Sequence, residues 1–227
     1  VPGAPAAGRG AGFGGVGEPG GQYVLAAMTT SSLESEATYT SPLGQRYATP
    51  AMLANFSDRR RVLLWRDLWI ALAEAERGLG LPISAAQVEA LRAAREQIDL
   101  GRVAELEAKL RHDVMAHVHH FGEVAGAEAA KIIHLGATSC FVTDNAELVM
   151  IRAGLELVMD RLVAALERLG SFAAAQREQP CLAFTHFQPA QLTTVGKRAC
   201  LWAQDLALDL ETIAALTGRL PLRGVKG

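Results

Sequence analysis

Histidine is the side chain in this sequence that is best suited to proton transfer near neutral pH. Five of the six histidines fall within 23 residues, and the sixth, His186, stands apart between Thr185 and Gln188 in a predicted loop. A loop histidine is often only a surface or a hydrogen-bonded structural residue. We nevertheless take His186 as the first candidate for an acid or a base. The clustered histidines are His112, His117, His119, His120 and His134.

The histidine cluster is poorly arranged for binding a metal ion. Zinc requires ligands that converge on one point, usually as a tetrahedron. His112, His117 and His119 are spaced five and two residues apart. On a helix, side chains with this spacing would point in different directions. We therefore expect no metal site.

The composition is that of a globular protein that acts on a small molecule or a protein partner. Half of the residues are hydrophobic, and the formal net charge of -2 gives no general attraction to nucleic acid or to an anionic membrane. No apolar stretch reaches the roughly 18 residues of a membrane span. The odd number of cysteines without CxxC spacing argues against a disulfide framework and favours a reducing, cytoplasmic setting. These cysteines are Cys140, Cys181 and Cys200.

Short helices are predicted in the first half of the chain. Ser57 or Asp58 can cap a helix whose apolar residues follow a helical period, and Ser84 can cap a second one. A third is expected to contain residues 111–121. Together these helices predict a small helical N-terminal domain over residues 41–137.

Two much longer helices are predicted in the second half. Beyond Thr143 and Asp144, either of which could cap, apolar residues recur three or four positions apart as far as Leu169. A second stripe of this kind runs from Leu192 to Leu216. Two long helices make half of a helical bundle, so we predict an all-α fold.

The chain is predicted to have three regions. Residues 1–40 form a leader that is rich in glycine and proline in its first 27 positions, and we expect disorder there because ordering would cost backbone entropy with little burial. Residues 41–137 form the helical N-terminal domain, and residues 138–227 begin the bundle domain. Since a bundle usually needs further helices, we expect the sequence to be truncated.

Two motifs, in order, resemble the fumarase/aspartase superfamily, whose members release fumarate or a similar product by anti-elimination. Residues 184–191, Phe-Thr-His-Phe-Gln-Pro-Ala-Gln, are similar to its Thr-His-x-Gln-x-Ala pattern. Residues 136–139, Gly-Ala-Thr-Ser, followed by Asp144 and Asn145, resemble its Gly-x-Thr-Ser segment at the start of a long bundle helix.

Segments 41–47 and 111–117 resemble one family of that superfamily, the adenylosuccinate lyases, and the resemblance extends over about residues 41–227. It implies a cytoplasmic homotetramer with shared sites that eliminates fumarate from adenylosuccinate, giving AMP, and from SAICAR, giving AICAR. It implies a nucleotide substrate and no metal or redox cofactor. Argininosuccinate lyase is the nearest rival, and segment 111–117 argues against it.

The resemblance also implies roles for single residues. His186 would be the general acid that protonates the leaving purine nitrogen, and His112 would orient or assist the substrate near the same reacting centre. Arg46 and Tyr47 would hold the nucleotide phosphate. The same side chains could instead be ordinary turn, packing, ion-pair and capping residues. The remaining substrate-binding residues that it implies are Arg111, His112, Asp113, Thr138, Ser139 and Thr185.

The family's loop of pattern Ser-Ser-x-Met-Pro-x-Lys-x-Asn-Pro has no match in this sequence. The serine of that loop is the implied base, so we expect the 227-residue chain alone to be inactive. The alternative is a catalytically silent helical module that associates with full-length lyase subunits, or another fumarate-releasing lyase of the superfamily.

Overall fold

The structure is a computed structural model that describes residues 41–226. The expected disorder of residues 1–40 concerns a part of the chain outside that range. The chain divides into two units, Val1–Gln45 and Arg46–Gly227, with the short helix α2 (Pro42–Arg46) at the boundary. All the other described helices and both described strands belong to the second unit. A further division between residues 137 and 138 stays a prediction.

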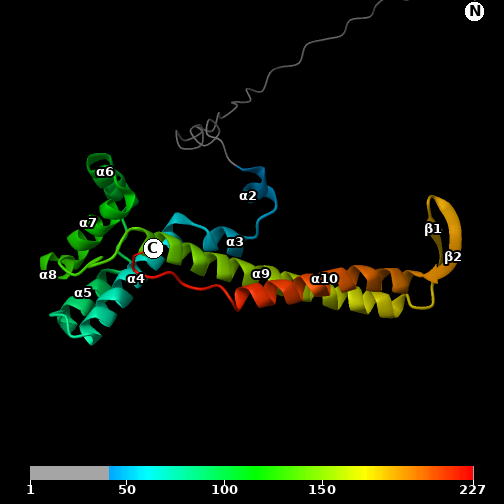
Figure 1. Cartoon of the computed structure of the whole chain (residues 1–227). Helices are drawn as coiled ribbons and strands as arrows, with labels where there is room; N and C mark the ends of the chain where they lie inside the picture. Colours follow the sequence, from blue (N-terminus) through cyan, green and yellow to red (C-terminus); the bar gives the residue numbers. More distant parts are fainter. Residues whose placement is uncertain (1–40, 227) are drawn as a thin grey trace, which may run out of the picture. The chain divides into compact units, whose positions relative to one another are not determined.

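The starts of the short helices follow from their caps. The Ser57 hydroxyl accepts the amide of Arg60 at the start of α4, and Ser84 forms a capping box with Gln87 at the start of α5. Both predicted caps are confirmed, and the cap of α4 is Ser57 rather than Asp58. In Figure 1 these helices are α3 (Pro50–Asn55), α4 (Asp58–Gly78), α5 (Ala85–Ala94), α6 (Leu100–Leu110), α7 (Asp113–Ala125) and α8 (Ala127–Ala130).

The main hydrophobic core lies where α4, α5, α7 and α8 meet the first turns of α9 (Cys140–Ala175). Trp69 and Phe121 are both fully buried there, and their rings stack with centroids 6.1 Å apart. Val142 and Ala146 bring α9 into the same cluster. Each large side chain buried in this way contributes about 1.5–3 kcal/mol, so the core fixes the beginning of α9.

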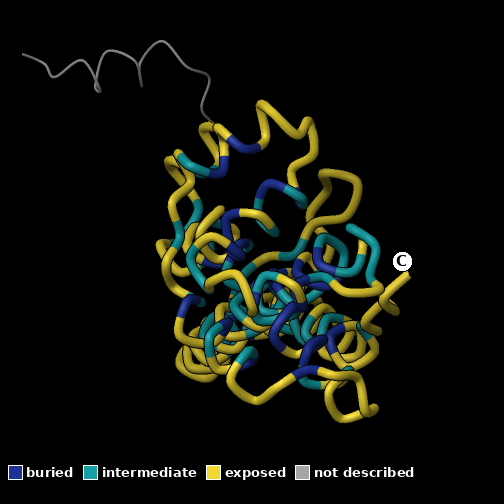
Figure 2. The backbone as a smooth tube through the Cα atoms, turned by 90° about the vertical axis from the view of Figure 1, so that its left-hand side faces the viewer, coloured by how far each residue is buried: buried dark blue, intermediate teal, exposed yellow. Residues whose placement is uncertain are grey.

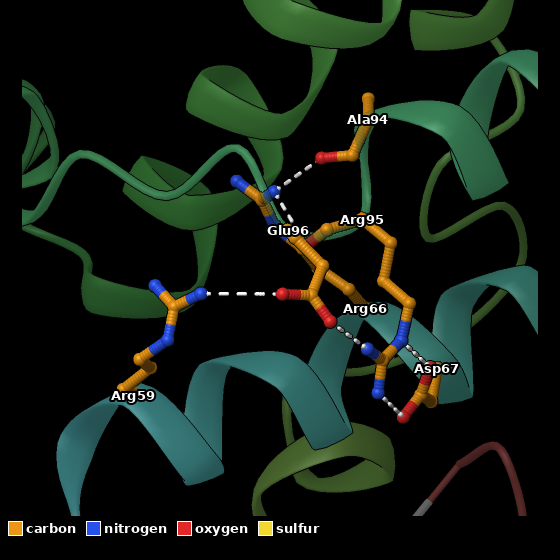
Figure 3. Close-up of polar contacts among 6 residues, drawn as sticks. All are labelled: Arg59, Arg66, Asp67, Ala94, Arg95 and Glu96. Carbon is orange, nitrogen blue, oxygen red and sulfur yellow. Dashed lines mark hydrogen bonds and ion pairs between the residues drawn. The ribbon is translucent and has the colours of Figure 1, made fainter.

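A buried arginine ties α4 to the end of α5 (Figure 3). Arg66 is 1% exposed, and its Nη1 donates to the carbonyl oxygens of Ala94 at 2.7 Å and Arg95 at 2.9 Å, at the C-terminal end of α5. Its guanidinium also lies 4.6 Å from the ring centroid of Phe121. Burial, with a smaller contribution from the charge of Arg59, lowers the pKa of Arg66 to about 10, so it stays charged at neutral pH. Beside it, Figure 3 shows a chain of ion pairs through Arg59, Glu96, Arg95 and Asp67.

Two long helices, α9 and α10 (Val195–Thr217), pack side by side as predicted (Figure 1). Their first residues differ from the prediction. Helix α9 begins at Cys140, so that Thr143 and Asp144 lie inside it, and Thr194 caps α10. The two helices approach closely where α10 begins, because a Cβ atom added to Gly196 would lie 2.4 Å from a backbone oxygen of α9.

The segment between the two long helices is an antiparallel hairpin rather than a loop. Strand β1 (Pro180–Thr185) pairs with β2 (Gln188–Thr194). The expectation of a mostly helical fold is confirmed, with this hairpin added to it. Both strands are largely exposed, so neither needs the alternation of apolar and polar residues that reveals a half-buried strand.

Apolar side chains remain exposed along both long helices. Trp202 and Leu208 of α10 are 55% and 54% exposed, and Phe172 of α9 is 45% exposed. In Figure 2 much of the described backbone is accordingly coloured as exposed or intermediate. Within residues 41–226 no helix is long and apolar enough to cross a membrane.

Candidate active site

His112 lies at the junction between two helices. Arg111 ends α6 in the left-handed conformation, with φ of 54°, and His112 is the N-cap of α7. Its Nδ1 accepts the amide of Met115 at 3.4 Å and lies 3.4 Å from the Asp113 carboxylate. Sequence reasoning placed His112 inside a helix. As the N-cap it is instead held at the helix end with its side chain 45% exposed.

Ser139 faces this histidine from the start of α9. Its hydroxyl Oγ is 3.3 Å from Nε2 of His112 and makes no capping bond to its own helix. Since Nδ1 accepts the Met115 amide, the neutral ring carries its proton on Nε2 and donates it to Ser139. The Ser139 hydroxyl can therefore donate its own proton to another acceptor, such as a carboxylate or a phosphate.

Thr138, next to Ser139, is held by the segment at residues 223–225. The Thr138 amide donates to the carbonyl of Val225 at 2.9 Å. The buried Asn145 side chain holds the same segment, because its Oδ1 accepts the Arg223 amide at 2.7 Å and its Nδ2 donates to the Arg223 carbonyl at 3.1 Å. In the sequence, Asn145 stands out only as part of a motif. Its role in holding Arg223 could not be predicted, because Arg223 lies 78 positions away.

Five of the expected site residues therefore gather where α7 and α9 begin. Arg111, His112 and Asp113 are exposed, so a cation and an anion border the imidazole and hydroxyl groups. Such a surface can hold a substrate by charge and by hydrogen bonds. The gathered residues are Arg111, His112, Asp113, Thr138 and Ser139.

His186 lies at the tip of the hairpin. Thr185 pairs with Gln188, which leaves His186 and Phe187 as the two residues of the turn. Both have positive φ, 49° and 61°, as the type I′ turn requires, although Asn and Gly are the residues that adopt it most readily. Phe187 is 98% exposed, and Thr185 and His186 are exposed as well.

Tyr47 lies beside the middle of α9. It is 75% exposed and borders a surface pocket of about 540 Å³ that is also lined by Leu157 and Arg161 of α9 and by Leu206 of α10. Arg46 precedes it and is exposed.

The expected site residues thus occupy three places along one helix. With 36 residues and a rise of 1.5 Å each, α9 is about 54 Å long. His112 contacts its first turn, Tyr47 lies near its middle, and the hairpin with His186 follows its last turn. The expectation that His112 and His186 share a reacting centre is therefore not met within a single chain.

Among the clustered histidines, His120 is buried, and His117 and His134 lie against the core side chains Trp65 and Trp69. His117 packs edge-on against Trp65 with centroids 5.0 Å apart, and His120 accepts the amide of Asp99 at 3.0 Å. Burial is the main cause that lowers the pKa of His117 to about 4, with the charge of Arg66 adding to it. Burial likewise lowers the pKa values of His120 and His134.

Among residues 41–226, no three His, Cys, Asp or Glu side chains gather in a way that could hold a metal ion.

The long helix pair, with the Thr-Ser turn at one end and the Thr-His hairpin at the other, is the arrangement expected of the fumarase/aspartase superfamily. The chain belongs to the Lyase family, whose sequence profile matches residues 45–227.

Two curated relatives are adenylosuccinate lyases. The enzyme of Schistosoma mansoni is 47% identical over 190 residues, which cover 83% of this chain and 39% of that protein. The enzyme of Saccharomyces cerevisiae is 50% identical over 194 residues, which cover 83% of this chain and 40% of that protein. The chain therefore spans about two fifths of the length of these relatives.

A solved structure has a similar fold. The 3-carboxy-cis,cis-muconate lactonizing enzyme of Pseudomonas putida matches with a TM-score of 0.72 and 28% sequence identity, covering 80% of this chain and 42% of that one.

Proposed function

We propose that this chain is part of an adenylosuccinate lyase. The reaction would be the non-hydrolytic cleavage of a C–N bond, releasing fumarate from adenylosuccinate to leave AMP, and from SAICAR to leave AICAR. The 47–50% identity to two adenylosuccinate lyases carries the proposal. The pairing of His112 with Ser139 supports it, since it places a proton donor and a hydroxyl at an exposed, charged surface.

The elimination divides into two proton transfers. A base removes a proton from the carbon next to the C–N bond, the electron pair forms the double bond of fumarate, and the C–N bond breaks. The leaving nitrogen then takes a proton, which we assign to His186. A histidine suits this role because an imidazole can donate a proton near neutral pH.

The substrate would be held by the remaining residues of the candidate site. Arg46 and Tyr47 would bind the phosphate, because a guanidinium offers a fork of donors and a phenol adds one more. The residues around His112 would bind the succinyl carboxylates or orient the reacting bond. Those residues are Arg111, Asp113, Thr138 and Ser139, with Thr185 contributing from the hairpin.

One complete site would need more than one copy of the chain. His112 and His186 lie at opposite ends of α9, a helix about 54 Å long, so only different copies can bring them together. The exposed apolar side chains of α9 and α10, such as Trp202 and Leu208, would be covered in that assembly. A homotetramer is the assembly that we propose, and the three unpaired cysteines fit a cytoplasmic setting.

The 227-residue chain alone would lack one catalytic group. No segment of it matches the serine loop that would supply the base. We propose that the chain binds lyase subunits carrying that loop and contributes His112 and His186 to shared sites. If it binds such subunits without adding to activity, it is the silent helical module instead.

The test is His186→Gln in a full-length subunit carrying residues 41–226. Turnover should fall by about 10²–10⁴-fold while the Michaelis constant changes little, because an acid for the leaving group acts mainly in the transition state. His119→Gln, on the exposed face of α7, is the matched control and should retain activity. Near-normal turnover of His186→Gln would show that His186 is not the acid.

A further inference from the structure

We propose that the corner between the β1–β2 hairpin and the first two turns of α10 is a binding site for a small organic anion. A pocket of about 270 Å³ lies there, with walls from both strands and from Lys197, Arg198 and Leu201 of α10. None of these three residues has a part in the proposed function. The inference goes beyond that function, and its binding test does not depend on it.

The pocket carries two positive charges without a matching negative one. Lys197 and Arg198 are consecutive, both are exposed, and no acidic residue lines the pocket. Within residues 41–226 neither side chain has an ion-pair or hydrogen-bond partner. Glu178, in the loop before β1, is already paired with Arg177 at 3.3 Å. An anion bound between Lys197 and Arg198 would relieve the repulsion between two neighbouring cations.

The donors that such an anion would use are side chains rather than the free amides of a helix start. The amides of Val195 and Gly196 both donate at 2.9 Å to carbonyl oxygens that follow α9, those of Gln179 and Gln176. The Lys197 amide donates to the Thr194 hydroxyl at 3.1 Å. The first amides of α10 are therefore satisfied, and binding depends on the groups that line the pocket.

The lining fits an anion that also has an apolar part. The Arg198 guanidinium offers a fork of donors that matches a carboxylate or a phosphate, and the Gln191 amide and Thr193 hydroxyl add neutral donors from β2. Phe184 and Leu201 complete the wall with apolar surface and are 60% and 52% exposed. A ligand with a carboxylate or phosphate group on a small carbon skeleton would use both kinds of surface.

A ligand in this corner would also restrain the hairpin. It would contact β1, β2 and α10 at once, and the pairing of the two strands is irregular at this point, with a register shift between Ala183 and Phe184. His186 lies two residues beyond Phe184, at the tip. Strands with few buried contacts open locally at little cost, so a bound ligand should slow their opening.

The experiment measures binding of fumarate, AMP and inorganic phosphate by calorimetry, at constant ionic strength, to a full-length subunit carrying residues 41–226. The double variant Lys197→Gln, Arg198→Gln should bind at least one of these probes about 10-fold more weakly at one class of sites, because each side chain offers a charge-assisted bond. Tighter binding of fumarate would identify a carboxylate ligand, and tighter binding of phosphate or AMP a phosphate ligand. Either result supports the proposal.

Arg168→Gln is the matched control, since it removes an exposed cation of α9 outside the pocket. It should bind all three probes as the wild type does. Equal weakening in the control and the double variant would indicate general charge attraction and overturn the proposal. Unchanged binding by the double variant would overturn it as well.

Arg111→Ala distinguishes this inference from the proposed function. That variant should weaken binding at the candidate active site and leave the sites at Lys197 and Arg198 intact, whereas the double variant should do the reverse. If only Arg111→Ala weakens binding, this inference fails and the proposed function stands. If only the double variant does, the inference stands even if the protein proves inactive on adenylosuccinate.

Amide hydrogen exchange locates the bound ligand. Saturating probe should slow exchange over residues 181–194 in the wild type and in Arg168→Gln, but not in the double variant. Unchanged exchange of these residues in a wild-type protein that binds the probe would place the ligand elsewhere and overturn the proposal.

Discussion

The imidazole Nε2 of His112 lies 3.3 Å from the hydroxyl Oγ of Ser139. This contact joins the residue that precedes α7 to the residue that precedes α9. The two residues are 27 positions apart. Each occupies an N-cap position, but only His112 uses its side chain to cap. The Ser139 hydroxyl is therefore available to the candidate site rather than to the helix.

Ser139→Ala should reduce activity without reducing stability. The hydroxyl makes no capping bond, so the free energy of unfolding should change by less than about 0.5 kcal/mol. Loss of one hydrogen bond at the site should lower kcat/KM by about 3- to 10-fold in a full-length subunit. Ser57→Ala is the matched control, because Ser57 is a true cap and its loss should cost about 1 kcal/mol with activity kept. A Ser139→Ala variant that loses stability and keeps activity would remove Ser139 from the site.

Substitutions of Arg111 should affect the stability of the protein and its binding of substrate differently. Its left-handed φ of 54° favours glycine, so Arg111→Gly should be more stable than Arg111→Ala by about 1 kcal/mol in urea unfolding. Both variants lose the guanidinium, so both should raise the KM for adenylosuccinate to a similar extent. Equal stability of the two variants would show that the backbone carries no strain, and an unchanged KM would place Arg111 outside the site.

Acid should destabilise this part of the protein through the partly buried His117. The pKa of His117 falls from 6.5 to about 4 in the folded state, so the unfolded state binds more protons as the pH drops. This contribution to stability is present above pH 6.5 and is lost between about pH 6.5 and 4. Unfolding measured across that range should give a shallower pH dependence for His117→Leu than for wild type, while the exposed control His119→Gln keeps the wild-type profile. Identical profiles for His117→Leu and wild type would contradict the assignment.

Asn145→Asp should destabilise the junction between α9 and residues 223–225. The Asn145 side chain is 1% exposed, and its Nδ2 donates to two carbonyl oxygens, those of Phe141 and Arg223. An aspartate there would bury a charge against both, at a cost of about 3 kcal/mol or more. Its neighbour provides the control, because Asp144→Asn removes only a partly exposed ion pair with Arg223, worth less than about 1 kcal/mol. Urea unfolding at one protein concentration compares the two variants, and equal losses would contradict the role given to Asn145.

The parts of the fold that local signals determine could be predicted from the sequence. Helix α4 has a side-chain cap at Ser57 and a regular apolar stripe, and both are visible in a single sequence. The start of α9 was missed because Ser139 does not cap it, while Thr143 and Asp144 look like caps but bond within the helix.

The hairpin was missed for a different reason. Its strands are largely exposed and carry two prolines, Pro180 and Pro189, so their sequences lack the period-2 alternation of apolar and polar residues that identifies a strand. The residues of the candidate site could be chosen by resemblance, but not their separation. Only the uninterrupted length of α9 reveals that His112 and His186 belong to different ends of the long helix pair.

The central claim is that this chain supplies its residues to a lyase site that it cannot complete alone. The direct measurement follows fumarate release from adenylosuccinate by absorbance, first with the purified 227-residue chain. It is then repeated after adding a full-length adenylosuccinate lyase subunit that has an intact serine loop but a disabled equivalent of His186. We predict no release from either protein alone and release from the mixture, because the chain then provides the missing acid. Release by the chain alone, or a mixed complex that forms and stays inactive, would contradict this claim.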